Sequence, residues 1–156
     1  MLEEICRELN NWFDTNPNDG TKNHYFGTFV IEDGNIDLSE TDIQPSQYFR
    51  IIGSVFNDGV YQYPATGLTD ETFDGAVWAM NVPPSVIALT AEIQAWQDKY
   101  GGFDSTAMSP FTSESFGGYS YSKSGRSGSG GADAGAGTWQ SAFANRLGKW
   151  RKIRAI

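Results

Sequence analysis

The pattern of apolar residues at the start of the chain has the period of a helix. Spacings of 3, 1, 3, 3 and 1 place six side chains on one face: Leu2, Ile5, Cys6, Leu9, Trp12 and Phe13. An apolar stripe of this kind predicts an amphipathic helix over residues 2–13. We expect the helix to end in DTNPNDGTKN, because Asn, Asp, Pro and Gly all favour turns.

The next block alternates between extended runs and turns. HYFGTFVIEDGNIDLS holds two short runs around Asp33-Gly34, and QYFRIIGSVFNDGVYQYP repeats this design with runs 48–56 and 60–63 around Asn57-Asp58-Gly59. Such turns between β-branched and aromatic runs are typical of hairpins. They predict a small, twisted antiparallel sheet, while residues 65–81 are expected to form a connection or a further short strand through 76–80.

Two more helices follow from the sequence. Pro83-Pro84 suits the first turn of a helix, the apolar residues after it recur with a 3-4-3-4 rhythm, and Gly101-Gly102 is a stop signal. A last helix is predicted over residues 138–153, with a stripe formed by Trp139, Phe143, Leu147, Trp150 and Ile153.

These elements predict an α+β fold, in which amphipathic helices pack with a small antiparallel sheet. We divide the chain into a compact body over residues 1–102, an arm with a Gly/Ser-rich tether over 103–137, and a basic amphipathic helix over 138–156. The N-terminus has no basic start or apolar run, so a secretory signal is not expected, and no apolar run is long enough for a membrane span.

Charge is distributed unevenly along the chain. Residues 1–145 contain all nineteen acids and six basic residues, whereas the last eleven residues contain five cations and no acid. An acidic body is unsuited to general nucleic-acid binding, but it suits a surface that DNA passes without sticking. The basic end suits docking onto an acidic protein surface.

No catalytic or metal constellation emerges, and no cofactor is expected. DTNPNDG resembles a calcium loop, but its Gly20 is one place late and the twelfth position is Tyr25, so a solvated turn is favoured. The acids of LTDETFDG, which include Asp70 and Glu71, are interpreted as structural. The single Cys6 is expected to be a buried thiol.

The C-terminal helix has two interpretations that the sequence leaves open. It either packs on its own chain or docks on another molecule, and docking is favoured because a long tether precedes it and cations surround Trp150. The arm alternates Tyr119 and Tyr121 with serines, which is the period of one extended strand that needs another sheet edge.

The segments GSVFNDGVYQYP, LTDETFDGAVWAMNVPPSVIAL, SPFTSESFGGYSYS and WQSAFANRLGKWRKI carry a resemblance. Together they resemble the head-tail connector, or adaptor, proteins of tailed bacteriophages. The SES-x-GG-YS segment followed by a closing helix with tryptophan and basic residues is the most diagnostic part. Many connectors are mainly helical, and the sheet expected over residues 25–63 departs from them.

The resemblance implies a structural role in the virion, after synthesis in the bacterial cytoplasm. About a dozen copies would form a ring between the portal and the stopper or tail-completion protein, and DNA would pass through the ring without specific binding. The residues that would bind the portal or a neighbouring subunit are Ser113, Glu114, Ser115, Phe116, Tyr119, Tyr121, Trp139, Phe143, Leu147, Trp150, Arg151 and Arg154.

The alternative is a small non-catalytic module that binds carbohydrate or peptide. Aromatic side chains would then line its site, and the candidates are Tyr48, Tyr61, Tyr63 and Trp78.

Overall fold

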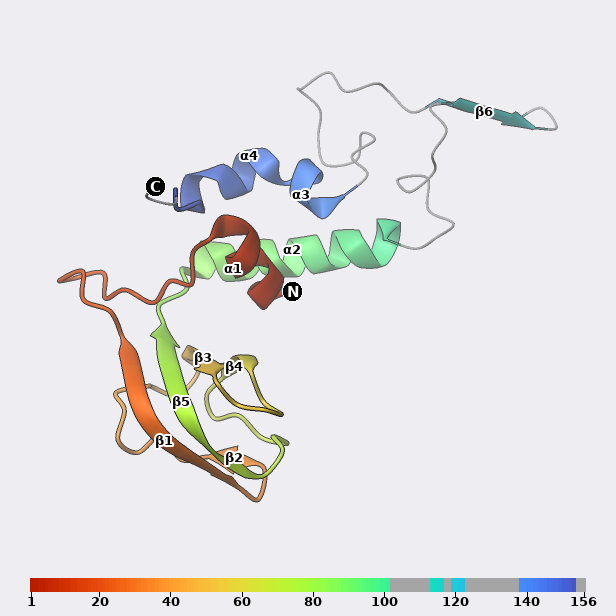
Figure 1. Cartoon of the computed structure of the whole chain (residues 1–156). Coiled ribbons are helices and arrows are strands. Elements are labelled where there is room, and N and C mark those ends of the chain that lie inside the picture. Colours follow the sequence, from red (N-terminus) through yellow and green to blue (C-terminus); the bar gives the residue numbers. More distant parts are fainter. Residues whose placement is uncertain (102–112, 117–118, 123–137, 154–156) are drawn as a thin grey trace. The chain divides into compact units, whose positions relative to one another are not determined.

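The computed structural model describes residues 1–101, 113–116, 119–122 and 138–153, and it has an α+β fold (Figure 1). The chain divides into two compact units, and Met1 groups with the second. We call Leu2–Pro84 the sheet unit and Ser85–Ile156 the C-terminal unit. The predicted fold class is therefore confirmed. The sheet belongs to the first of these units, and the helices that follow Pro84 belong to the second.

The first helix is shorter than the apolar stripe predicts. α1 spans Leu2–Leu9, and its Ile5, Cys6 and Leu9 are buried. Asn10 then takes the left-handed conformation with φ 50°, and the Asn11 amide donates to the Cys6 carbonyl. Asn tolerates this conformation at a helix end, so the helix stops four residues before the predicted boundary.

Five antiparallel strands form the sheet of this unit. Their order across the sheet is β2-β1-β5-β3-β4, with bounds His24–Glu32 (β1), Asn35–Ile36 (β2), Tyr48–Ile52 (β3), Gly59–Gln62 (β4) and Glu71–Met80 (β5). The predicted antiparallel sheet is thus confirmed. Its longest strand lies in the segment for which the sequence predicts only a connection or a short strand.

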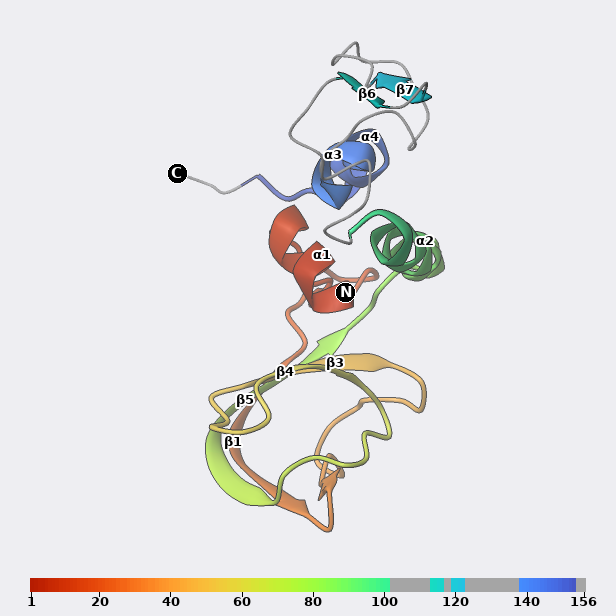
Figure 2. The same cartoon turned by 90° about the vertical axis from the view of Figure 1, so that its right-hand side faces the viewer.

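β5 runs through the middle of the sheet and pairs with β1 and β3. Its first half, Glu71–Gly75, is mostly polar and lacks the alternating apolar residues that would predict a strand. At Gly75 a Cβ would lie 2.2 Å from the Ile52 carbonyl oxygen, so neighbouring backbones approach too closely for any side chain. The close approach explains why a glycine occupies this position in the middle of a sheet. The sheet as a whole curls strongly (Figure 2).

The turns explain where the strands end. Asp33 and Gly34 have φ 52° and 75°, as a two-residue type I′ hairpin requires, and this turn is confirmed. The second hairpin has a longer loop than predicted, because β3 stops at Ile52. Gly53 has φ 92°, and its amide donates to the Asp58 carboxylate across the loop.

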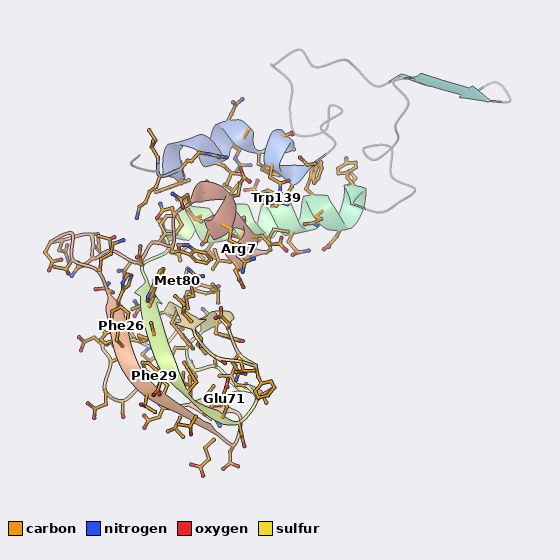
Figure 3. The ribbon with its side chains drawn as sticks, in the orientation of Figure 1. Arg7, Phe26, Phe29, Glu71, Met80 and Trp139 are labelled. Atoms are coloured by element: carbon orange, nitrogen blue, oxygen red, sulfur yellow. The ribbon has the colours of Figure 1, made fainter. Side chains whose placement is uncertain are left out.

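The core of the sheet unit lies on the concave face of the sheet. Phe49, Ile51 and Val77 are fully buried there, and side chains from the connecting loops complete the cluster. Alternate residues of β1 face the other way, which leaves Phe26 75% exposed (Figure 3).

The C-terminal unit is built on one long helix. α2 spans Pro84–Tyr100 and buries Val86, Leu89 and Ile93, so the predicted helix and its proline start are confirmed. The predicted single helix over residues 138–153 is broken into three short ones, α3 (Trp139–Ala142), α4 (Ala144–Leu147) and the 3-10 turn η1 (Gly148–Trp150). The break falls at Phe143, whose φ −108° and ψ 8° are not helical.

The arm contains a hairpin where the sequence predicts one extended strand. β6 (Ser113–Phe116) pairs antiparallel with β7 (Tyr119–Ser122), with Glu114 opposite Tyr121. The strand therefore finds its first partner within the arm. The predicted tether over residues 123–137 lies outside the described residues.

Candidate interaction surfaces

The six predicted partner-binding residues of the arm belong to the two strands of the hairpin. Ser113 pairs with Ser122, and Phe116 pairs with Tyr119 at the turn end. A two-stranded sheet is marginally stable in water by itself. The backbone of this hairpin is thus suited to joining a larger sheet.

Three of the five residues in the predicted apolar stripe of the C-terminal helices are buried in the chain. Trp139 in α3 (Figure 3), Phe143 and Leu147 are 7%, 4% and 1% exposed. Trp96 of α2 meets the Phe143 ring edge to face, with 6.3 Å between centroids. Of the two interpretations left open by the sequence, packing on the same chain accounts for these three side chains.

An ion pair also joins α2 to the C-terminal helices. Both Arg146 terminal nitrogens donate to the Glu92 carboxylate, at 2.5 and 2.9 Å. These hydrogen bonds hold the pKa of Glu92 below its ordinary value and raise the pKa of Arg146. The pair is a surface contact between α4 and α2, in addition to the buried aromatic contact.

The residues that remain on the surface at this end are mostly basic. Lys149, Arg151 and Lys152 are exposed, Trp150 is half-buried, and Ile153 is 95% exposed. The Lys149 ammonium lies 4.9 Å from the centre of the Trp150 ring. We call residues 149–153 the basic segment; the predicted site residue Arg154 lies outside the described residues.

A pocket of about 280 Å³ opens between the start of α2 and the C-terminal helices. Its lining combines apolar surface with cations and consists of Ser85, Leu89, Asn145, Arg146, Lys149 and Trp150. Pockets for small molecules are generally larger, about 300–1,000 Å³. This one has the size to take a single large side chain with an acidic neighbour.

The sheet unit presents an apolar tip that the sequence analysis missed. Val55 and Phe56, in the loop between β3 and β4, are 81% and 67% exposed. Two large apolar residues directly before Asn57-Asp58-Gly59 were the available signal, but the interpretation as part of a strand concealed it. Isolated exposed apolar residues are common on protein surfaces, so exposure by itself does not indicate a binding site. The hydrogen bonds that hold this loop are the further observation.

The base of this loop is held by a polar network. Ser54 and Asn57 are buried, and the Asn57 side chain bonds both the Thr69 backbone N–H and its carbonyl at 2.8 Å. Glu71, at the start of β5 (Figure 3), accepts hydrogen bonds from the side chains of both Ser54 and Asn57. The hydrogen bond from Ser54 is the main reason that the pKa of Glu71 lies below its ordinary value. The loop is thus a rigid support for its tip.

The convex face of the sheet carries a stack of rings around a half-buried guanidinium. Arg50, Trp78 and His24 are directly opposite one another on β3, β5 and β1. The Arg50 guanidinium lies 3.6 Å from the centre of the Trp12 ring, and His24 stacks on Trp78 at 4.1 Å. Burial lowers the pKa of Arg50, against the opposing effect of nearby acids. These contacts make the stack a structural element.

The turn that resembles a calcium loop is held by its own hydrogen bonds. Asn16 accepts from the Asn18 amide, and Asp19 accepts from Thr21, so the favoured interpretation as a turn is confirmed. Asp14 is bonded to Lys22 at 2.9 Å and lies 2.6 Å from His24. Burial acts to raise the pKa of Asp14, but these hydrogen bonds outweigh it and the pKa is lowered. Within the described ranges, no cluster of three or more metal-binding side chains is present.

Two further interpretations of single residues are confirmed. Asp70 accepts a hydrogen bond from the Gly34 amide, and Asp74 accepts one from the Thr28 hydroxyl, so with Glu71 the acids of LTDETFDG have structural roles. Burial raises the pKa of the Cys6 thiol to about 12, which leaves it as an unreactive core residue.

The aromatic residues of the alternative binding module lie on different faces of the sheet. Tyr61 and Tyr63 pack against the concave core, with Phe49 as a common neighbour. Trp78 belongs to the stack on the convex face, and Tyr48 faces the same way by strand alternation. These four side chains therefore do not line one site.

Comparisons with protein-family models, with curated proteins and with solved structures find no match. Among the helices of the described segments, none combines the length and the apolar character needed to cross a membrane.

Proposed function

We propose that this chain is a head-tail connector, a structural protein of a tailed-bacteriophage particle. Copies of it form a ring between the portal and the stopper or tail-completion protein, in the virion neck. The ring surrounds the channel through which DNA passes. The proposed role is one of assembly and is not catalytic.

The observation that carries this proposal is the separation of charge between the two units. The sheet unit has fourteen acids and three basic residues, whereas the C-terminal unit has eight basic residues and five acids. A strongly acidic unit repels phosphate, which suits a wall that DNA slides past. The exposed cations of the basic segment suit attachment to an acidic protein surface instead.

The C-terminal unit also supplies two ways to bind a partner. The hairpin β6–β7 offers backbone groups for addition to another sheet, and the basic segment offers charge next to the half-buried Trp150. Trp and Arg side chains tend to dominate binding energy at interfaces. In a ring, many identical arms would bind at once, and this avidity would offset weak single contacts.

The proposal is tested by electron microscopy of the full chain mixed with the portal protein encoded by the same genome. The wild-type chain should add a layer of density to one face of the portal ring. Reversal of two charges in Arg151→Glu/Lys152→Glu should abolish this layer at physiological salt. The control variant Arg7→Glu/Lys99→Glu removes two exposed cations elsewhere and should still bind.

Absence of any added layer with the wild-type chain would contradict the proposed function. Equal binding by both double variants would show that the basic segment is not the portal contact.

A further inference from the structure

We propose that the tip formed by Val55 and Phe56 inserts into the C-terminal pocket of a second copy of this chain. The inference rests on the proposed ring and names the contact between its neighbouring subunits. The tip belongs to the sheet unit and the pocket to the C-terminal unit, so each copy would supply one half of every contact.

The tip is built as a binding element. Val55 and Phe56 are adjacent and largely exposed, yet Asn57 beside them is 3% exposed and bonds to Thr69 and Glu71. The network holds the loop in one conformation before any partner arrives. A side chain held in this way loses little conformational freedom on binding, which improves affinity.

The pocket has a size and lining that fit such a side chain. Its volume of about 280 Å³ leaves room for one large side chain, and Leu89 and Trp150 give it apolar surface. Phe56 is the larger of the two tip residues and would contact this apolar surface. An aromatic residue in a pocket is a common form of interface anchor.

The charges around the two halves are complementary. Asp58 and Asp70 are exposed on the loop and on the segment bonded to it, and the sheet unit as a whole is strongly acidic. Lys149 lines the pocket beside Arg146, which is already paired with Glu92, so Lys149 is the cation that would attract these acids. Opposite charges at the rim favour this pairing and its rate of formation over contacts between like units.

A contact between different surfaces of identical chains is a heterologous one. It repeats from copy to copy and forms a closed ring when the rotation between neighbours permits closure. A tip that meets a pocket of the next copy therefore provides the kind of contact that the proposed connector ring needs.

Disulfide trapping between two differently tagged full-length variants tests the inference. One variant carries Val55→Cys, which leaves Phe56 in place, and the other carries Ser85→Cys at the rim of the pocket. Oxidation traps contacts that form only briefly, and the native Cys6 is buried and serves as an internal control. The mixed dimer should form at least about tenfold faster than with Asp19→Cys, an exposed site on another turn, in place of Val55→Cys.

Two further substitutions separate the apolar and the electrostatic parts of the contact. Phe56→Ala in the first variant should slow trapping by about tenfold or more, as expected for a central aromatic anchor. Lys149→Glu in the second should slow it at low salt more than at high salt, and Lys99→Glu at the far end of α2 should not.

Equal trapping rates for Val55→Cys and Asp19→Cys would overturn the inference, and so would trapping that Phe56→Ala leaves unchanged. The outcome is separable from the proposed function. A chain that joins the portal but shows no selective trapping refutes the tip-and-pocket contact alone, whereas a chain that does not join the portal refutes the connector role.

Discussion

The two units of this chain organise their apolar side chains in different ways. The sheet unit encloses its core within a curled sheet and uses buried polar groups such as Asn57 and Asp14 to fix its loops. Among its described residues, the C-terminal unit has one long helix and three short ones of three or four residues. Helices this short do not persist alone in water, so packing against α2 must hold them.

This difference agrees with the proposed function. In the proposed connector the sheet unit would form a rigid, acidic wall, and the C-terminal unit would attach to a partner, because its order depends on few contacts. Regions held by few apolar contacts are the ones that open locally and can adapt to a partner. We therefore expect a destabilising substitution in one unit to loosen that unit and to leave the other unit unchanged.

The largest effect is expected from Phe143→Ala. Truncation of a buried aromatic side chain typically costs about 3–5 kcal/mol of unfolding free energy, and Phe143 is also the contact of Trp96. Hydrogen exchange followed by mass spectrometry should show lost protection in α2, α3 and α4. Protection in β1, β3 and β5 should stay at the wild-type level, and its loss there would show that the two units unfold as one.

A somewhat smaller effect is expected in the sheet unit from Gly75→Ala. The added methyl group would meet the Ile52 carbonyl, and relief of the clash should cost about 2–3 kcal/mol. Gly148→Ala is the matched control in the C-terminal unit, since a Cβ there has nothing within 4 Å and the backbone is helical. Urea unfolding monitored by circular dichroism should show a lower midpoint for Gly75→Ala and an unchanged or higher one for Gly148→Ala.

The elements that could be predicted from the sequence are those determined by a few neighbouring residues. The Asp33-Gly34 turn and the start of α2 at Pro84 depend on backbone preferences of one or two residues, and both were predicted. The strand β5 was largely missed because its first half has a polar sequence, and the extended conformation there depends on pairing with the strands on both sides. Close backbone approach at Gly75 is a tertiary constraint that no local pattern reveals.

The residues of the candidate interaction surfaces were likewise predicted only in part. The stripe of Trp139, Phe143 and Leu147 was recognised, but a stripe does not say which surface covers it, and here it is buried in the chain. The tip at Phe56 was missed because its exposure depends on the network around Asn57 and Glu71, whose members lie far apart in sequence. The basic segment was predicted from charge alone.

A third prediction concerns the ion pair of the sheet unit, in which the Asp14 carboxylate is buried and Lys22 is exposed. The folded pKa of Asp14 is lowered, so its contribution to stability is present above the unfolded pKa and is lost as pH falls through the folded pKa. Asp14→Asn should therefore cost about 1–2 kcal/mol at neutral pH and flatten the loss of stability below pH ~4. Thermal unfolding across pH measures both, and an acid limb as steep as that of the wild type would contradict the assignment.

The smallest effect is expected from Glu92→Gln in the C-terminal unit. Glu92 and Arg146 are both about half exposed, so water and salt weaken their interaction far more than that of Asp14. The lowered pKa of Glu92 has the same sign of pH dependence, with stability gained above the unfolded pKa and lost on acidification. The unfolding temperature should fall less than for Asp14→Asn, and the difference from wild type should disappear at high salt. Asp98→Asn, a neighbouring acid on α2 that is bonded to Gln94, is the control. If Glu92→Gln lowered the unfolding temperature by the same amount at low and high salt, the Glu92–Arg146 pair would not be the screened surface interaction described here.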